Sequence, residues 1–132
     1  VFNDTEYIDG KYGWLTESSR GQFYRKESDV SELYKDGIWG KEDGVFRVAL
    51  PNGTYKVTCF FYPLNESSKN KINIIANGKK VIKNLKISDE KGTISRSYSV
   101  KITDERLTQV IYTGIGYNSR WVLNGCIIEQ RQ

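Results

Sequence analysis

Hydrophobic and polar residues alternate most clearly over residues 45–62. In the first half, Phe46 and Val48 stand on either side of Arg47. In the second half, four apolar residues share one phase: Tyr55, Val57, Cys59 and Phe61. A period of two is typical of an antiparallel strand with one face buried. The pattern therefore predicts two half-buried strands, one in each half of this segment.

The residues between these two runs predict a tight turn. Pro51 fixes its own φ, and Gly53 tolerates a positive φ, so the sequence Leu-Pro-Asn-Gly-Thr over residues 50–54 favours a sharp change of direction. We expect the two strands to form a hairpin. A second hairpin is predicted where residues 71–76 and 79–82 flank Asn77-Gly78, a pair typical of a type I′ turn. Alternation or apolar runs predict further strands over 93–102, 107–112 and 121–129.

Residues 16–44 differ from the rest of the chain. They have no steady apolar period and are rich in charged residues, serine and glycine, so we expect a long loop. A loop of that length is uncommon in a compact domain unless it binds a ligand or is flexible. Because loops run over the surface, the aromatic and arginine side chains here are candidates for ligand contact. They are Arg20, Phe23, Tyr24, Arg25, Tyr34 and Trp39.

Together these elements predict an all-β fold. About eight strands, short turns and almost no helix are typical of an antiparallel β-sandwich or jelly roll. A length of 132 residues favours a single domain over residues 1–132. No stretch approaches the ~18 apolar residues of a membrane helix, so we expect no membrane partner. The sequence contains no Met and does not open with a charged-then-apolar stretch, so we expect a domain excised from a larger, secreted, multimodular protein.

The net charge of the chain gives little information about its binding partners. The net charge is +4 and the isoelectric point is about 9.0, which indicates either a mild preference for acidic partners or simply a lysine-rich solvated surface. Several lysines gather over residues 69–83, within one predicted hairpin. Nucleic-acid binding needs a continuous basic face, and no arginine-rich run or nucleic-acid motif is present, so we expect no nucleic-acid partner.

The two cysteines leave two interpretations open. Cys59 and Cys126 each occupy the apolar side of a predicted strand, where a thiol packs as a small hydrophobe. A disulfide requires their Cα atoms to lie within about 7 Å, hence on neighbouring strands. We favour two buried thiols over a bridge. A zinc site is excluded because it needs more ligands and the chain has no histidine.

The composition also argues against catalysis. Without histidine the chain lacks the commonest general base, which excludes Ser-His and Cys-His nucleophilic machinery. A glycosidase needs two carboxylates about 5–10 Å apart across a cleft. The acidic residues over 17–43 are scattered among lysines, as on an ordinary surface. We expect no catalytic residues and no enzymatic activity.

Three segments, in order and spacing, resemble a known family. They are Gly13-Trp14, the run Phe-Arg-Val-Ala-Leu-Pro-Asn-Gly-Thr-Tyr-Lys-Val over residues 46–57, and Leu-Asn-Gly-Cys-Ile-Ile-Glu over 123–129. This pattern resembles the galactose-binding-like β-sandwich modules attached to bacterial polysaccharide-degrading enzymes. The resemblance is strongest to the N-terminal accessory domain of rhamnogalacturonan acetylesterases and related pectin-active enzymes, and looser to malectin-like modules.

The resemblance covers nearly the whole chain and implies a carbohydrate-binding module that requires no cofactor. In such modules ligands bind among the loops at one end of the sandwich or on its concave face. A structural Ca²⁺ near the first strand is common there. Four acidic residues could supply oxygen ligands, although their spacing matches no calcium loop: Asp4, Glu6, Asp9 and Asp43.

Sugar recognition needs flat aromatic rings against the C–H faces of the sugar and polar groups for its hydroxyls. The candidate aromatic platforms are Trp39 and Tyr34 from residues 16–44 and Tyr117 from residues 114–120. The candidate polar partners are Arg20, Arg25, Asn118 and Arg120. An arginine can hold the carboxylate of a uronic acid with two hydrogen bonds.

Each of these candidates has a purely structural alternative. Trp39, which lies between Gly37 and Gly40, either displays its ring or plugs the end of the sandwich, and the arginines can simply be solvated. Trp14 and Trp121 adjoin predicted strands, so we expect them to pack in or around the core.

The sequence therefore favours a secreted or cell-surface bacterial domain that acts as a monomer and binds polysaccharide. We expect it to target an attached polysaccharide-degrading enzyme to a plant cell-wall polysaccharide, pectic or related. The alternative is a structural accessory domain that packs on a neighbouring catalytic domain and binds no sugar. That alternative predicts that Trp39, Tyr34 and Tyr117 are buried or face a protein partner.

Overall fold

The computed structural model describes residues 12–14, 20–24, 36–40, 43–61, 71–86, 94–114 and 121–131, and only the backbone before Gly40. These ranges form eleven strands and no helix. The strands are β1 (Tyr12–Trp14), β2 (Arg20–Tyr24), β3 (Asp36–Gly40), β4 (Gly44–Ala49), β5 (Gly53–Phe61), β6 (Lys71–Ala76), β7 (Lys79–Lys86), β8 (Ile94–Ile102), β9 (Arg106–Thr113), β10 (Trp121–Leu123) and β11 (Gly125–Arg131).

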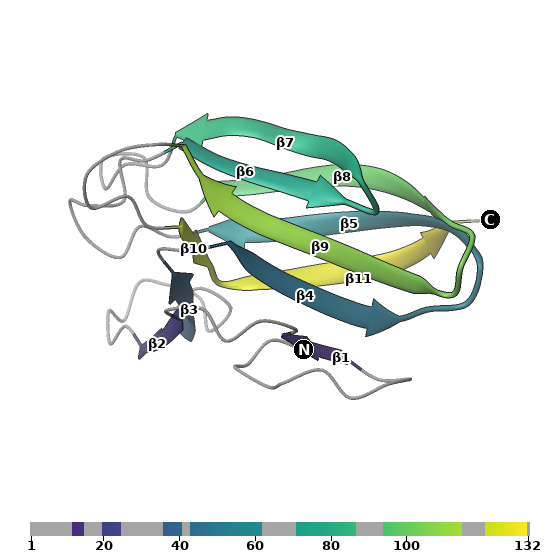
Figure 1. The fold of residues 1–132 in the computed structure, drawn as a ribbon, viewed down its shortest axis with the longest axis horizontal. Coiled ribbons are helices and arrows are strands. Elements are labelled where there is room, and N and C mark those ends of the chain that lie inside the picture. Colours follow the sequence, from purple (N-terminus) through teal and green to yellow (C-terminus); the bar gives the residue numbers. More distant parts are fainter. Residues whose placement is uncertain are drawn as a thin grey trace.

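The strands form a sandwich of two sheets with a small third sheet at one end (Figure 1). The larger sheet has the order β1-β4-β9-β6-β7, and the sheet behind it has the order β11-β5-β8. The third sheet has the order β10-β3-β2. Each pairing between these strands is antiparallel. The predicted all-β, antiparallel sandwich is therefore confirmed.

The core lies between the two larger sheets and follows the alternation seen in the sequence. On β5 the four residues of the apolar phase are buried, whereas Lys56 and Thr58 are half-exposed on the outer side. On β4, Phe46 is buried beside the half-buried Arg47. Isoleucines from β6 and β9, which lie in the same sheet as Phe46, belong to the same core and face the β5 side chains from the opposite sheet. Burial of this apolar surface is the main favourable contribution to folding, so one face of each sheet is fixed by the sequence.

The predicted hairpin at Pro51 is wrong. β4 pairs with β1 and β9, whereas β5 pairs with β11 and β8, so the chain crosses from one sheet to the other between them. The hydroxyl of Tyr55 donates to the Pro51 carbonyl at 2.6 Å, and Asn52 Oδ1 accepts from the Glu105 amide at 2.8 Å. Alternation identifies which side chains are buried, but it does not identify the strand that shares the backbone hydrogen bonds.

The second predicted hairpin, β6–β7, is confirmed. Asn77 and Gly78 have φ values of 47° and 83°, and two successive positive φ angles are the signature of a type I′ turn. The Asn77 side chain also attaches this turn to β9. Its Oδ1 accepts from the Thr108 amide at 2.7 Å, and its Nδ2 donates to the Arg106 carbonyl at 3.1 Å.

The expectation of one long loop over residues 16–44 is also wrong, because this segment contains β2 and β3. β3 lies between β2 and β10 and is paired on both sides. Backbone hydrogen bonds along two edges can hold a short strand whose side chains show no apolar period. Arg20 and Trp39 therefore lie on strands and not in an irregular segment.

The predicted last strand is divided in two. β10 pairs with β3, and β11 pairs with β5, so the chain changes sheets at Asn124. Asn124 is buried, and its backbone amide donates to the Phe60 carbonyl at 2.8 Å. The Asn-Gly pair inside this apolar run, which is typical of a bulge, marks the point of division.

Candidate functional site

The two ends of the sandwich differ in how the strands are connected. At one end, the three connections are residues 50–52, 77–78 and 103–105, each of two or three residues. We call this the closed end, and the chain's C-terminal end lies beside it (Figure 1). At the other end, three connections are longer, residues 62–70, 87–93 and 114–120, each of seven to nine residues, whereas residues 41–43 and Asn124 form short ones. We call this the open end.

The small β10-β3-β2 sheet lies at the open end (Figure 1). Its register brings together two segments that are far apart in the sequence. Gly40 on β3 stands opposite Arg20 on β2 and opposite Trp121 on β10. Trp39, the preceding residue, stands opposite Gly21 and Val122. The segment that carries Trp39 is therefore adjacent to the strand that directly follows residues 114–120.

Trp121 holds this small sheet against the core. Its side chain has no exposed surface, which confirms the expectation that it packs in the interior. A Cβ at position 40 would lie 2.5 Å from Trp121 Cζ2 and 2.7 Å from Cε2, so the indole ring lies directly on the Gly40 backbone. Any side chain at Gly40 would displace the ring. The sequence indicated the burial of Trp121 but not its contact with Gly40.

The predicted site residues fall largely beyond what the structure describes. Tyr34, Arg25, Tyr117, Asn118 and Arg120 lie outside the described residues. For Arg20 and Trp39 the backbone alone is described, at the positions given above. The side chain of Trp14 is likewise not described. The role of each in ligand contact therefore stays a prediction.

A buried polar cluster links the two main sheets, and sequence reasoning missed it. Gln109 on β9 is 2% exposed. Its Oε1 accepts from the Tyr98 hydroxyl at 2.6 Å and from the Cys59 thiol at 3.6 Å. Its Nε2 donates to Cys126 Sγ at 3.8 Å. The signal in the sequence was the position of Gln109, which alternates in phase with the apolar residues Leu107 and Ile111. A glutamine on the buried face of a strand needs hydrogen-bond partners in the core.

This cluster changes the pKa values of its members. Burial, with smaller contributions from Cys59 and Cys126, raises the pKa of Tyr98 far above its ordinary value. The hydrogen bond with Cys126, followed by burial, raises the pKa of Cys59. The hydrogen bond with Cys59 lowers the pKa of Cys126; burial opposes this, and the Gln109 amide adds to it. We assign this cluster no ligand.

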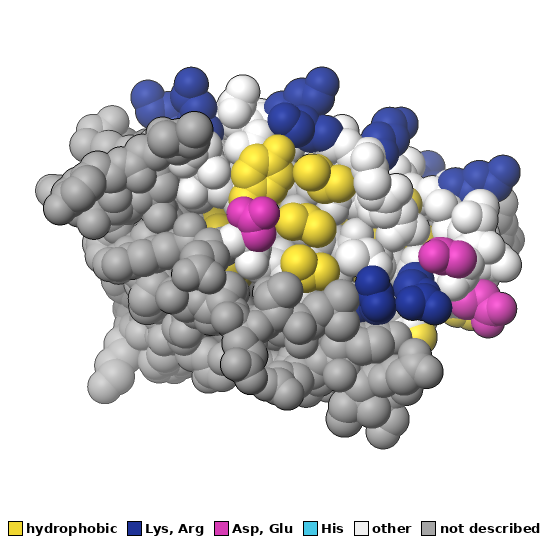
Figure 2. All heavy atoms as spheres, in the orientation of Figure 1, with side chains coloured by type: hydrophobic (Ala, Val, Ile, Leu, Met, Phe, Trp, Pro, Cys, Tyr) yellow, Lys and Arg dark blue, Asp and Glu magenta, His cyan; other side chains and the backbone are white. Residues whose placement is uncertain are grey.

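The outer faces of the two main sheets differ in chemistry. Half-buried apolar side chains lie side by side on the five-stranded sheet, where the register sets Val110 opposite both Val45 and Ile75 (Figure 2). Nearby, Lys80 Nζ lies 5.9 Å from the centre of the Tyr112 ring. The outer face of the three-stranded sheet is mainly polar, with Thr58 and Ser97 hydrogen-bonded across β5 and β8 at 2.8 Å. Ile127 on β11, which stands opposite Thr58, is the exception and is 45% exposed.

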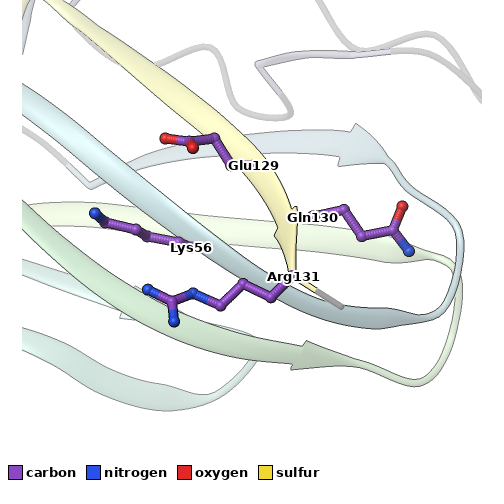
Figure 3. Close-up of a pocket in the computed structure, with 4 residues that line it drawn as sticks. All are labelled: Lys56, Glu129, Gln130 and Arg131. Atoms are coloured by element: carbon purple, nitrogen blue, oxygen red, sulfur yellow. The ribbon is translucent and has the colours of Figure 1, made fainter.

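A shallow, open pocket lies at the closed end, on the outer side of β5 and β11. Its volume is about 310 Å³, and its lining residues are Lys56, Glu129, Gln130 and Arg131. Figure 3 shows the Lys56 and Arg131 side chains extending in the same direction, whereas Gln130 points away from them. No aromatic ring lines this pocket, so it lacks the apolar platform on which a sugar ring stacks.

The described residues contain no grouping of three or more His, Cys, Asp or Glu side chains that could hold a metal ion. Of the acidic residues that could serve a structural Ca²⁺, Asp4, Glu6 and Asp9 lie outside the described part. Asp43 is exposed at the start of β4. Among the described residues no helix is long and apolar enough to cross a membrane.

The malectin domain profile matches residues 3–131. A comparison with curated protein sequences finds no match.

Solved structures share the fold at low sequence identity. One is the β-glucuronidase of Bacteroides uniformis, with a TM-score of 0.75 and 18% identity, over 98% of this chain and 15% of that chain. Another is the Bacillus subtilis protein YXIM, with a TM-score of 0.74 and 17% identity, over 97% and 34%. A third is the ANX1 ectodomain of Arabidopsis thaliana, with a TM-score of 0.72 and 16% identity, over 89% and 34%. The chain thus spans about a third or less of these relatives.

Proposed function

The chain belongs to the malectin-domain family, a family of carbohydrate-binding, non-catalytic domains, and from this we propose that it binds carbohydrate at the open end of the sandwich. The observation that supports the proposal is the strand register of the small sheet, in which Gly40 on β3 pairs with Arg20 on β2 and with Trp121 on β10. It joins the segment that holds Trp39 to the strand that follows residues 114–120. Long connections carried by a rigid sandwich are the usual location of binding residues.

The chemistry of these segments suits a saccharide. Trp39, Tyr34 and Tyr117 would supply aromatic surfaces for the C–H faces of sugar rings. Asn118 and the arginines at 20, 25 and 120 would supply hydrogen bonds to hydroxyl groups. Arginine also binds a carboxylate through two parallel hydrogen bonds, which favours a uronic acid unit in the ligand.

We further propose the biological setting. The domain would be extracellular, monomeric and attached to a polysaccharide-degrading enzyme, which it would hold on a plant cell-wall polysaccharide of the pectic type. The sequence resemblance to accessory domains of rhamnogalacturonan acetylesterases supports this setting. The structural similarity to one part of a β-glucuronidase supports attachment to a larger enzyme, and the similarity to the ANX1 ectodomain supports an extracellular location. Tethering raises the effective concentration of the enzyme at its substrate without a new contact in the catalytic domain.

Affinity electrophoresis tests the proposal. The purified chain would migrate through gels that contain pectin, galactan, xylan or glucan, and we expect retardation in at least one gel, foremost pectin. Isothermal titration with oligosaccharides of the retarding polymer would then give the affinity. Absence of retardation in every gel would contradict carbohydrate binding.

Two aromatic substitutions locate the site. Trp39→Ala should weaken binding at least tenfold, because loss of one stacking ring removes about 1.5 kcal/mol or more. Tyr112→Ala is the matched control, because it removes an aromatic ring from the outer face of the five-stranded sheet. It should leave the affinity within a factor of two. Circular dichroism would verify that both variants are folded, and loss of binding in Tyr112→Ala alone would move the site to the sheet face.

The alternative is that the domain packs on a neighbouring catalytic domain and binds no sugar. The observation that favours it is the apolar surface of Val45, Ile75, Val110 and Tyr112 on the five-stranded sheet (Figure 2). Under this alternative no gel retards the chain. The Ile75→Lys variant would then weaken the association of the two domains when they are produced as separate polypeptides, whereas Trp39→Ala would not.

A further inference from the structure

Cys59 and Cys126 face each other across two hydrogen-bonded strands. The register of β5 and β11 pairs these two residues directly. Their sulfur atoms are 3.4 Å apart, and both are free thiols. Directly opposed residues of antiparallel strands have Cα atoms about 4.5–5.5 Å apart, which is within the range that disulfides span. Closing a sulfur–sulfur bond of about 2.05 Å requires the two atoms to approach by roughly 1.4 Å.

The surroundings of the two thiols would tolerate their oxidation. In the thiol form, Cys59 donates a long hydrogen bond of 3.6 Å to Gln109 Oε1. That oxygen also accepts the much shorter bond from the Tyr98 hydroxyl, at 2.6 Å. If Cys59 loses its proton, Gln109 keeps the stronger of the two bonds, and its Nε2 still lies beside the Cys126 sulfur. No buried polar atom of the cluster would be left without a partner.

We propose that Cys59 and Cys126 form a reversible disulfide that joins β5 to β11, by exchange with a small-molecule disulfide such as oxidised glutathione. The inference rests on the register, the distance between the sulfurs and the hydrogen bonds around them. It does not depend on carbohydrate binding.

The difference in exposure sets the order of the steps. Cys59 has no exposed surface, whereas Cys126 is partly exposed at the edge of the same sheet. The Cys126 thiolate attacks one sulfur of the small-molecule disulfide, whose S–S bond breaks and releases one thiolate. Cys59 then gives up its proton and attacks the Cys126 sulfur, which forms the protein disulfide and releases the second thiol. The protein loses two protons and two electrons, and the small-molecule disulfide is reduced to two thiols.

The pKa values of the two groups agree with this order. The hydrogen bond with Cys59 lowers the pKa of Cys126, and the thiolate is the attacking form. The pKa of Cys59 is raised, so the interior thiol stays protonated until its partner has reacted. Exchange should accordingly be faster at pH 8.5 than at pH 6.5.

The bond would connect residues that are 67 positions apart in the sequence. It would link the last strand to the central strand of the three-stranded sheet and restrict the unfolded chain. Cross-links of this kind commonly stabilise a small domain by several kilocalories per mole. We expect the melting temperature of the oxidised form to exceed that of the reduced form by roughly 5–15 °C.

Mass spectrometry of the wild-type protein tests the proposal. The folded chain would be equilibrated with excess oxidised glutathione, quenched with acid, unfolded, and alkylated with N-ethylmaleimide. We expect no alkylation, a peptide pair joined through Cys59 and Cys126, and full alkylation after dithiothreitol. Two alkylated thiols, or a persistent glutathione adduct on the wild-type chain, would overturn the proposal.

Two single variants test the order of attack. Cys59→Ser leaves Cys126 without its partner, so a stable glutathione adduct should accumulate. Cys126→Ser leaves only the interior thiol, which should remain unmodified while the protein is folded. An adduct on Cys59 in the Cys126→Ser variant would overturn the assignment of Cys126 as the attacking thiol. The wild-type experiment decides the existence of the disulfide even where a variant folds poorly.

Discussion

The closed end and the open end of this sandwich are held by different interactions. At the closed end, two- and three-residue turns are fixed by side chains that bind the backbone: Asn52 to Glu105, Asn77 to Arg106 and Thr108, and Tyr55 to Pro51. At the open end three connections are longer, and the small sheet lies there, with the Trp121 ring packed on Gly40.

This difference separates two tasks within one domain. The short turns at the closed end fix their own geometry, so they stabilise the sandwich and leave little surface for a ligand. The pocket at the closed end is open, and its lining residues are polar and either half-exposed or exposed. The open end has the longer connections, where sequence can vary without a cost to the core, and the small sheet lies beside them. Binding residues are therefore expected there.

The largest effect should follow from removal of the Trp121 ring. Trp121→Ala should destabilise the domain by about 3–5 kcal/mol, because the ring is fully buried and its loss leaves a cavity. Gly40→Ala should cost about 1–3 kcal/mol, because the added Cβ would lie 2.5 Å from the ring. Urea denaturation measures both. A cost below 1 kcal/mol for Trp121→Ala would mean that the small sheet is not part of the cooperative unit.

At the closed end, Asn77→Ala should cost about 1–3 kcal/mol. It removes two hydrogen bonds to the backbone of β9 and places alanine at a φ of 47°, where a Cβ is strained. Asn77→Gly isolates the hydrogen bonds, since glycine adopts this φ freely, and should cost less than the alanine variant. Equal costs for the two variants would show that backbone strain contributes nothing. Denaturation curves of both variants at one pH provide the comparison.

Between the two ends, the buried Tyr98 hydroxyl, which donates to Gln109, should make the free energy of unfolding decrease as the pH rises above about 10. Burial raises the pKa of Tyr98, so the folded chain keeps this proton above pH 10, whereas the unfolded chain loses it. Unfolding is therefore favoured as the pH rises, by about 1.4 kcal/mol per pH unit for one group. In the Tyr98→Phe variant, the free energy of unfolding should fall less steeply between pH 10 and 11.5, because this contribution is absent. Identical slopes in the two proteins would contradict the raised pKa.

The smallest effect is expected in the pocket of the closed end. Lys56→Ala and Arg131→Ala should each change the free energy of unfolding by no more than about 0.5 kcal/mol, because Lys56 is half-exposed and Arg131 is exposed. They should leave the carbohydrate affinity within a factor of two. A tenfold loss of carbohydrate affinity in either variant, measured by isothermal titration, would place the ligand at the closed end and not at the open end.

Much of the secondary structure could be predicted from local patterns. The alternation of β5, the Asn77-Gly78 turn and the strands at 94–102 and 106–113 follow from side-chain period and from backbone preference. The burial of Trp121 followed from its place in an apolar run. β2 and β3 could not be predicted in this way, because their pairing depends on backbone hydrogen bonds to other strands and their side chains carry no periodic signal.

The sequence by itself determined which residues of most strands face the core, because the hydrophobic effect acts on each side chain wherever its strand lies. Only the tertiary structure decided which strands pair. It set β4 and β5 in different sheets, divided the last strand at Asn124, and brought Cys59 opposite Cys126 and Gly40 beneath Trp121. Pairing is a relation between segments distant in the chain, and a local pattern of polar and apolar residues contains no information about its partner.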